Sequence, residues 1–509
     1  MSRTANSLRN IKTSILLKLV ALLVNFAARR IFIETLSVAY LGLNGTFSNI
    51  LSVLSLAELG VGSAITFSLY KPLAENNNEL ILSILALYKK LYTAIGVVVL
   101  IIGVSLTPFL SYLIKDLPDL PHIQLIYILF VLGSAISYFF VYKQSLINAD
   151  QKQYITVKYN YFSSMACTVL QCLFLYLTHD FIVYLCLSIG CGVINNVLLS
   201  NKANRLYPFI KTGEVKSLPT STKKEITRNV SAMMAHKLGS VVVNGTDNLL
   251  IAYFVGAIPV GLYSNYLMIT AGLNSAYGMV FGAITASVGN LNASESKEYT
   301  MTVFKRINFF VQWLAGFSAI AIFVLSDHFI SSIWLKKEYA LGLSIVLVIA
   351  LNFYVTTMRR GVLTFREAMG LYWYDRHKPI AESIINLVAS ILLARSYGIL
   401  GILLGTFIST MTTCFWIEPC VLYKYGFMSS VRPYFVDYLI NTLVTMIAGF
   451  ATWRVCELFP AEGLLAFLAK AAVCAVLPNI AFLLVYIKRP ELKHYYTLVK
   501  GIVCKKRPA

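Results

Sequence analysis

Apolar runs of about 18 or more residues recur along the whole chain, and they constrain the fold more than any other feature. Each run is long enough to cross ~30 Å of hydrocarbon. A backbone in lipid must satisfy its own hydrogen bonds, so only helices or closed barrels span a membrane, and these runs are continuous rather than alternating. The predicted fold class is therefore all-α, a polytopic membrane protein built as a helix bundle.

Composition excludes two other classes of protein. Of 509 residues, 58% are apolar and 13% are charged, whereas an ordinary soluble enzyme carries roughly twice that charged fraction. The net charge of +20 does not indicate a nucleic-acid binder, because the basic residues lie in segments between apolar runs, where anionic lipid explains them. The nine cysteines form no CxxC pair and are interpreted as small buried hydrophobes.

The apolar runs predict about fourteen transmembrane helices, called spans 1 to 14 in chain order, near residues 14–37, 43–70, 82–112, 122–146, 155–177, 180–200, 229–254, 259–287, 303–326, 341–365, 379–396, 398–423, 433–456 and 463–487. The charges of the loops between them predict their orientation. With a cytoplasmic N-terminus, the inner segments hold roughly thirty of the 43 basic residues. The first apolar run is a first span rather than a signal peptide, since Arg29 and Arg30 interrupt it and no cleavage site follows. The basic tail also falls inside, so both termini are predicted to be cytoplasmic. The outer segments hold only Lys115, Lys336, Lys337, Arg395 and Arg454.

An internal repeat divides the chain. The segment from Gly45 to Asn49 recurs from Gly261 to Asn265, and Lys89-Lys90 then matches Lys305-Arg306 without a gap. Six spans separate the copies, so both halves enter the membrane in the same direction. We predict two parallel six-helix lobes around a central cleft, plus two extra helices. The predicted parts are an N-terminal lobe at 1–200, a basic cytoplasmic linker at 201–228, a C-terminal lobe at 229–424, and spans 13 and 14 with the tail at 425–509.

Ionisable and amide side chains inside the first span of each lobe are candidates for lining the cleft, because such groups are costly in lipid. Lys18, Asn25 and Arg29 share one helix face in span 1, since their separations are nearly whole turns. A guanidinium can bind phosphate oxygens in a bidentate manner, so Arg29 is the preferred candidate for a diphosphate headgroup, with a structural salt bridge as the alternative. Lys18 can instead snorkel to the interface. Arg30 is a further candidate, although Glu34 one turn on favours a local ion pair.

Span 7 carries a similar polar stripe. It includes Lys237, Asn244 and Asn248, with Asn248 at the position that Arg29 occupies in span 1. Asp247 flanks the stripe and has three interpretations: it pairs with Arg29 or Arg30, it titrates as a proton or Na⁺ site that couples transport, or it forms a static structural pair. No other cofactor and no metal site is predicted.

Arg359 and Arg360 can be placed in two ways. Hydropathy alone ends span 10 near Met358 and puts both at the inner interface. Matching Lys143 with Arg366 through the repeat extends the span and makes both arginines cleft cations, which we favour. Glu58 and Glu418 could also face the cleft, but a solvated, capping or locally paired role is the default.

Catalytic constellations are absent from the sequence. Six scattered histidines, with no HExxH, no GxSxG and no phosphate-binding glycine loop, predict that the protein is not an enzyme.

Several segments together carry a family resemblance. They are Tyr40-Leu41-Gly42-Leu43-Asn44-Gly45, Leu56-Ala57-Glu58-Leu59-Gly60-Val61-Gly62, Asn244-Gly245-Thr246-Asp247-Asn248, Arg366-Glu367-Ala368-Met369-Gly370-Leu371-Tyr372-Trp373, Pro379-Ile380, Asn386-Leu387 and Gly398-Ile399-Leu400-Gly401. Over about residues 10 to 425 the chain resembles the oligosaccharide (Wzx-type) flippases of the multidrug/oligosaccharidyl-lipid/polysaccharide (MOP) exporter superfamily.

The resemblance implies a function. Such a protein passes an undecaprenyl-diphosphate-linked sugar repeat unit across the bacterial plasma membrane, for surface polysaccharide synthesis, by alternating access. Its expected partners are the polyprenyl-diphosphate-linked oligosaccharide, membrane lipid and possible export proteins such as a polymerase, with no nucleic acid. Two alternatives stay open: a multidrug or lipid-precursor exporter of the same superfamily, and a membrane polysaccharide polymerase.

Overall fold

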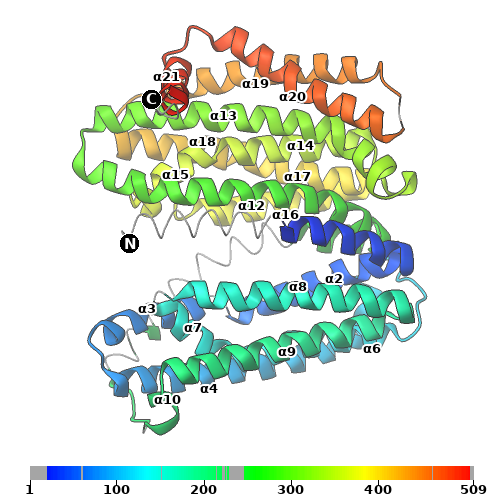
Figure 1. The fold of residues 1–509 in the computed structure, drawn as a ribbon, viewed down its shortest axis with the longest axis vertical. Coiled ribbons are helices and arrows are strands. Elements are labelled where there is room, and N and C mark those ends of the chain that lie inside the picture. Colours follow the sequence, from blue (N-terminus) through cyan, green and yellow to red (C-terminus); the bar gives the residue numbers. More distant parts are fainter. Residues whose placement is uncertain are drawn as a thin grey trace. The chain divides into compact units, whose positions relative to one another are not determined.

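The computed structural model is helical throughout its described residues, with no strand among them (Figure 1). The structure describes residues 20–58, 61–150, 152–213, 215–220, 224, 226–227, 246–460 and 462–504. The chain divides into two compact units, unit 1 (Met1–Gly261) and unit 2 (Leu262–Ala509). This division does not coincide with the predicted linker at 201–228, and the predicted lobe boundaries stay a prediction.

Unit 1 begins, in the described residues, with a helix over residues 20–35, and its last complete helical segment spans residues 246–254, shortly before the unit ends at Gly261. Helix α9 packs on α6 and α8, while α4 packs on α3, α6 and α7. The elements between are α2 (Val38–Leu54), η1 (Ser55–Glu58), α3 (Val61–Ala74), α4 (Asn78–Ser105), η2 (Thr107–Phe109), α5 (Leu110–Leu113), α6 (Ile123–Tyr138), α7 (Val141–Ala149), α8 (Gln153–Thr178), α9 (Phe181–Leu206) and α10 (Phe209–Thr212).

Unit 2 is organised around α13, which packs on α14, α19 and α20. Its chain starts within α12 (Ala257–Ser294), which begins before the division. The other elements are α13 (Lys297–His328), η3 (Phe329–Trp334), η4 (Lys337–Tyr339), α14 (Leu343–Met358), α15 (Arg360–Ala368), η5 (Leu371–Trp373), α16 (Lys378–Tyr397), α17 (Ile399–Thr412), α18 (Cys414–Val421), η6 (Leu422–Phe427), α19 (Arg432–Cys456), α20 (Leu464–Tyr486) and α21 (Pro490–Cys504).

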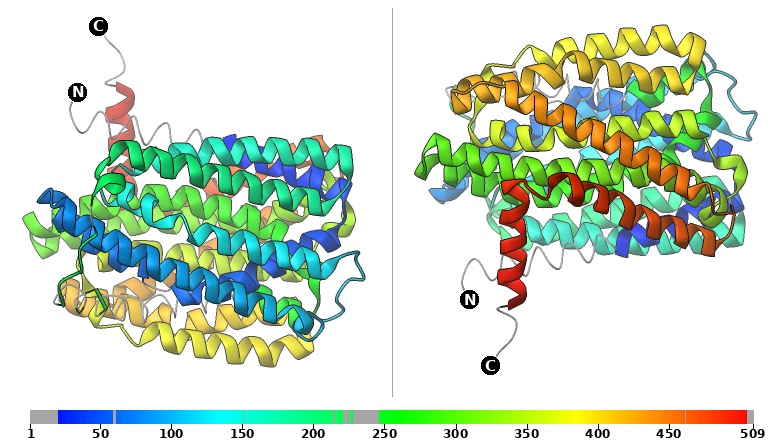
Figure 2. Two further views of the ribbon diagram at one scale, coloured as in Figure 1. Left: turned by 90° about the horizontal axis from the view of Figure 1, so that it is seen from below. Right: turned by 90° about the horizontal axis from the view of Figure 1, so that it is seen from above.

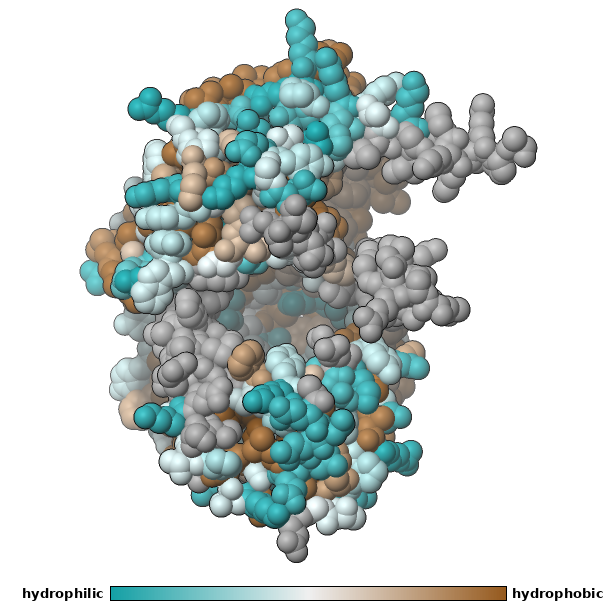
Figure 3. Space-filling model, turned by 90° about the vertical axis from the view of Figure 1, so that its left-hand side faces the viewer, coloured by the Kyte–Doolittle hydropathy of each residue, from teal (hydrophilic) through white to brown (hydrophobic). Residues whose placement is uncertain are grey.

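Local sequence explains where several helices begin. The side chains of Asn77, Asp180 and Ser296 accept hydrogen bonds from backbone N–H groups in the first turns of α4, α9 and α13. Gly398 has a positive φ of 56° at the turn between α16 and α17, a conformation that glycine adopts without steric cost. These caps lie in the polar turns that the sequence places between apolar runs. Figure 3 looks onto helix ends, where hydrophilic side chains gather.

The chain is a multi-pass membrane protein. Within the described residues, nine helices are long and apolar enough to cross a membrane, or ten if the bent pair α6 and α7 is one span. A described helical segment lies within each of the fourteen predicted spans. Part of the predicted basic tail forms α21, which leaves α20 at a steep angle in Figure 2.

Candidate functional site

Two arginines lie where one candidate span of unit 2 has a one-residue break between two helices. Helix α14 ends at Met358 and α15 begins at Arg360, yet both helices belong to one candidate span, Leu343–Ala368. Helical structure therefore continues past Met358, as the extended placement of span 10 requires, and the position of the two arginines relative to the membrane stays a prediction. Arg359 and Arg360 follow each other in sequence, so their side chains point in different directions and meet different partners.

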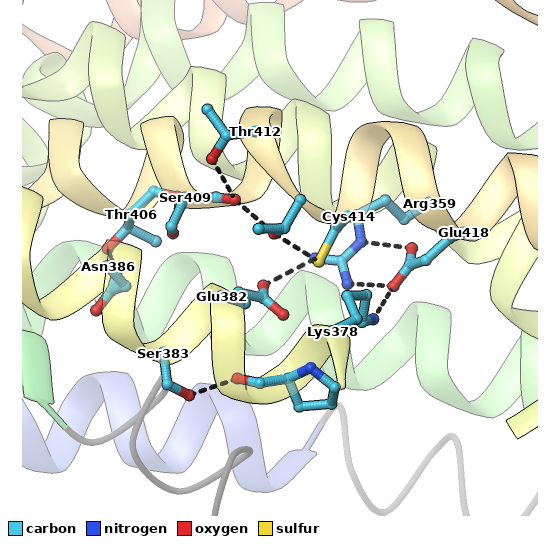
Figure 4. A network of polar contacts seen from close by, with 12 residues as sticks. Arg359, Lys378, Glu382, Ser383, Asn386, Thr406, Ser409, Thr412, Cys414 and Glu418 are labelled. Carbon is cyan, nitrogen blue, oxygen red and sulfur yellow. Dashed lines mark hydrogen bonds and ion pairs between the residues drawn. The ribbon is translucent and has the colours of Figure 1, made fainter. Parts of the chain in front are cut away.

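Arg359 is neutralised inside unit 2. Its Nε and Nη2 donate to the two carboxylate oxygens of Glu418, at 2.9 and 2.7 Å (Figure 4). Glu418 lies on α18 and its side chain is fully buried. The ammonium of Lys378, at the start of α16, bonds to the same carboxylate, and Glu382 lies 3.8 Å from the Arg359 guanidinium.

A further pair completes this cluster. Arg366 on α15 pairs with Asp375 and lies 3.9 Å from Glu418. Three cations thus meet three carboxylates, Glu382, Glu418 and Asp375, so the buried charges balance. A balanced, hydrogen-bonded cluster is stable where a single buried charge is not. The geometry favours a structural role for Arg359 over the cleft role we expected, because its guanidinium charge is already compensated. Glu418, for which a solvated, capping or locally paired role was the default, is instead buried and paired with residues 40 and 59 positions away.

Arg360 is held differently. Its Nη2 donates to the side-chain oxygen of Asn274 at 2.7 Å, and its guanidinium lies 5.8 Å from the ring centre of Tyr277. Both partners lie on α12. No carboxylate pairs with Arg360 among the described residues, and its buried Nε–H has no acceptor there. An amide and an aromatic ring orient a guanidinium without cancelling its charge. Arg360 can therefore bind an anion.

Sequence reasoning missed Asn274 and Tyr277. We searched the spans for ionisable groups, and these two side chains are neutral at pH 7. An Asn one turn before a Tyr in an apolar run is a weak signal by itself. It becomes informative only when a cation packs against that face.

Span 1 places its candidates in unit 1. Arg29 is half-buried and Asn25, one turn earlier, is exposed. Arg29 lies near Tyr184 of α9. Arg30 is exposed and its Nε donates to Glu34 at 2.8 Å, which confirms the expected local ion pair. Arg29 is thus the candidate of span 1 that lies against the unit's interior.

A partly open cavity of about 370 Å³ lies beside Tyr184 within unit 1. It is lined by residues of α2, α6 and α9, and most of its surface is apolar. Its wall carries the hydroxyl and amide side chains of Asn44, Ser48, Ser134, Ser137, Ser188 and Asn196. Hydroxyls and amides can donate to and accept from a sugar or a phosphate, and they are costly in an apolar span without such partners. The cavity and Arg29 share Tyr184 as a neighbour.

Only part of the span 7 stripe is described. Lys237 and Asn244 lie outside the described residues, as does Lys18 in span 1. Asn248 is half-buried, and its side-chain oxygen accepts no hydrogen bond within the described part of the chain. Asp247 is half-buried and takes part in an interaction. Its proposed coupling role stays a prediction.

Glu58 has a local partner too. The hydroxyl of Tyr92 donates to its carboxylate at 2.5 Å, next to a hydrogen bond of 2.9 Å between the hydroxyls of Tyr88 and Ser145. Among the described residues, no group of three or more His, Cys, Asp or Glu side chains could hold a metal ion.

Comparison with known proteins identifies the fold. No family model matches the chain, and no curated protein matches it. Its structure is similar to a lipid II flippase, MurJ, in an inward closed conformation, with a TM-score of 0.63 and 14% identity over 92% of this chain and 98% of that one.

Two multidrug transporters show the same fold. An inward-facing MATE family transporter of the MOP superfamily matches with a TM-score of 0.53 and 14% identity, over 79% of this chain and 96% of that one. A variant of the Vibrio cholerae MATE transporter VcmN matches with a TM-score of 0.51 and 14% identity, over 83% and 98%. The chain therefore has the fourteen-helix, all-α fold of MOP transporters.

Proposed function

We propose that this chain is a flippase that moves undecaprenyl-diphosphate-linked oligosaccharide repeat units across the bacterial plasma membrane, with both termini cytoplasmic. The observation that carries the proposal is the pair of half-buried arginines, Arg29 in unit 1 and Arg360 in unit 2, on a MOP-type fold. Arg360 is oriented by an amide and a ring rather than by a carboxylate, so its charge is available to a diphosphate.

The mechanism that we propose is alternating access. We propose that Arg29 and Arg360 bind the diphosphate of the cargo during this cycle, while the polyprenyl tail stays in the bilayer. The balanced cluster around Glu418 links α15, which carries Arg360, to α16 and α18. Asp247 is the candidate for H⁺ or Na⁺ coupling.

Coverage supports a lipid-linked cargo over a drug. The lipid II flippase matches 92% of this chain, whereas the two MATE transporters match 79% and 83%. The multidrug or lipid-precursor exporter remains the second candidate, since the MATE fold matches as well. A polysaccharide polymerase has the least support, because these structural neighbours are transporters.

The test is export of a surface polysaccharide in cells that depend on this protein. Arg29→Ala and Arg360→Ala should each abolish export while the protein stays in the membrane, and Arg→Lys at either position should restore part of it, because Lys keeps the charge but loses bidentate binding. Arg454→Ala is the matched control, since Arg454 is exposed and paired with Glu457. Normal export in both arginine-to-alanine variants would contradict the proposal.

A further inference from the structure

A groove between α8 and α9 of unit 1 takes no part in the features above. Its volume is about 680 Å³. The two helices are antiparallel neighbours joined by a short turn. The wall is mainly apolar and includes Phe162, Ala166, Leu170, Ile194 and Leu198. Phe162 and Ile194 are 61% and 60% exposed, so little of the protein covers the groove.

One end of the groove is basic and aromatic. Lys158 lies near the start of α8 and Lys202 near the end of α9, which is the same end of an antiparallel pair, and Tyr154 and Tyr159 line the groove beside them. Neither lysine pairs with a carboxylate in the part of the chain that the structure describes, whereas nearby Lys152 pairs with Asp150 at 2.7 Å. Lysines and tyrosines beside an apolar surface are typical of the level of lipid headgroups.

The length of the groove fits one leaflet. From Tyr154 to Leu170 the helix rises roughly 24 Å at 1.5 Å per residue. One leaflet with its headgroups is about half of ~40–45 Å. An occupant with its charge at Lys158 and Lys202 would therefore reach from the headgroups to near the middle of the bilayer.

The size of the groove suits one acyl chain. At ~30 Å³ for each methylene, close to the volume of a water molecule, 680 Å³ corresponds to about 20 carbons. A polyprenyl chain of about 55 carbons has a volume of roughly 1,600 Å³ by the same measure. One fatty acyl chain therefore matches the groove in size, whereas the whole tail of the proposed cargo is larger.

We propose that the α8–α9 groove is a binding site for one anionic phospholipid. Its phosphate binds between Lys158 and Lys202, and one acyl chain lies against Phe162, Ala166 and Leu170. The charges are complementary, since two lysines without a carboxylate partner meet a phosphate. The site is distinct from the arginines proposed to bind cargo and does not depend on what the protein transports.

The experiment measures lipid retention by the full-length chain. Native mass spectrometry of the purified protein, titrated with phosphatidylglycerol in detergent, should show one lipid retained more tightly than phosphatidylcholine. Lys158→Gln/Lys202→Gln should weaken that binding roughly 30-fold. Each lysine near an anionic lipid contributes a similar electrostatic attraction, and the double variant loses two such contributions. Ala166→Trp should weaken it as well by filling the groove without changing charge.

The matched control is Lys89→Gln/Lys90→Gln, which removes two exposed lysines of the same unit that do not line the groove. It should leave phosphatidylglycerol retention unchanged. An equal loss in this control, or no loss with Ala166→Trp, would show general surface attraction and overturn the site. Displacement of phosphatidylglycerol by millimolar inorganic phosphate would also overturn the site, because it would show that the lysines bind an anion and that the acyl chain contributes nothing. Since export is not the readout, this proposal and the flippase proposal can fail separately.

Discussion

The helix pairs α8–α9 and α16–α17 occupy the same place in the two predicted lobes, yet they pack in opposite ways. In unit 2, glycines draw α17 onto α16: a Cβ at Gly405 would lie 2.5 Å from the backbone nitrogen of Ser390, and one at Gly401 would lie 2.2 Å from the Leu393 oxygen. In unit 1, a Cβ at Gly190 of α9 would meet nothing within 4 Å. The pair α16–α17 is in close backbone contact, whereas a groove lies between α8 and α9.

The partners of a cation at one matched position of the repeat differ as well. Arg366 of unit 2 meets Asp375 and Glu418, whereas its counterpart in the repeat, Lys143 of unit 1, donates to the hydroxyl of Ser200 at 2.8 Å. In unit 2, carboxylates compensate Arg359 and its neighbours, whereas Arg360 of the same unit is held by an amide and a ring. In unit 1, Lys143 is held by a hydroxyl. Cations within one repeated fold are therefore held with a counter-charge at some positions and without one at others.

The largest expected effect comes from the carboxylate at the centre of the unit 2 cluster. Glu418→Gln should destabilise the protein by about 3–5 kcal/mol, because it leaves buried Arg359 and Lys378 without their shared counter-charge. Thermal unfolding in detergent measures this. Glu457→Gln, at an exposed pair with Arg454, should change stability by less than about 1 kcal/mol. Equal melting temperatures for the two variants would show that the cluster does not stabilise the fold.

The next effect tests helix packing. Gly405→Ala should cost about 1–3 kcal/mol, because the new methyl group overlaps backbone atoms of Ser390 that cannot move without shifting α16. Gly190→Ala, on an exposed helical position with open space, should be neutral or stabilise by up to about 1 kcal/mol. The same unfolding measurement compares the two. Similar losses at both glycines would mean that α8 and α9 are also closely packed.

The smallest effect lies at the end of α7 in unit 1. The hydroxyl of Tyr207 donates to Asp150 at 2.6 Å. Burial opposes ionisation of Asp150, but hydrogen bonds from Lys152 and Tyr207 outweigh it and lower the pKa of this carboxyl. Tyr207→Phe should cost about 1.5 kcal/mol at neutral pH, because the hydrogen bond involves a charged group.

The pH dependence of that effect has a definite sign. An aspartate with a lowered pKa stabilises the fold above its unfolded pKa of about 3.9, and that stabilisation is lost as the pH falls through the lower, folded value. The difference between wild type and Tyr207→Phe should therefore shrink below about pH 4. Unfolding curves at pH 7 and pH 3.5 measure it. A difference that is independent of pH would assign the loss to packing rather than to the carboxylate.

The sequence identified most of the charged residues that are candidates for the site, but it could not distinguish those with a structural role from those that can bind a ligand. Arg359 and Arg360 are adjacent and chemically identical, so both were expected in the cleft. Only the structure separates them, because Glu418 is 59 positions away from Arg359 and Asn274 is 86 positions away from Arg360. Arg30 and Glu34 were paired correctly in advance, since residues four apart on a helix are neighbours whatever the tertiary fold.

The sequence by itself determined that this chain is a bundle of membrane-spanning helices, because the length of an apolar run and the need to satisfy the backbone in lipid are local requirements. It also determined which side chains are costly within the spans. The tertiary structure alone decided which of those side chains find a counter-charge or a hydrogen-bond partner inside the protein. Pairing of charges, and the approach of α17 to α16 against the groove between α8 and α9, depend on contacts between distant segments that no local pattern contains.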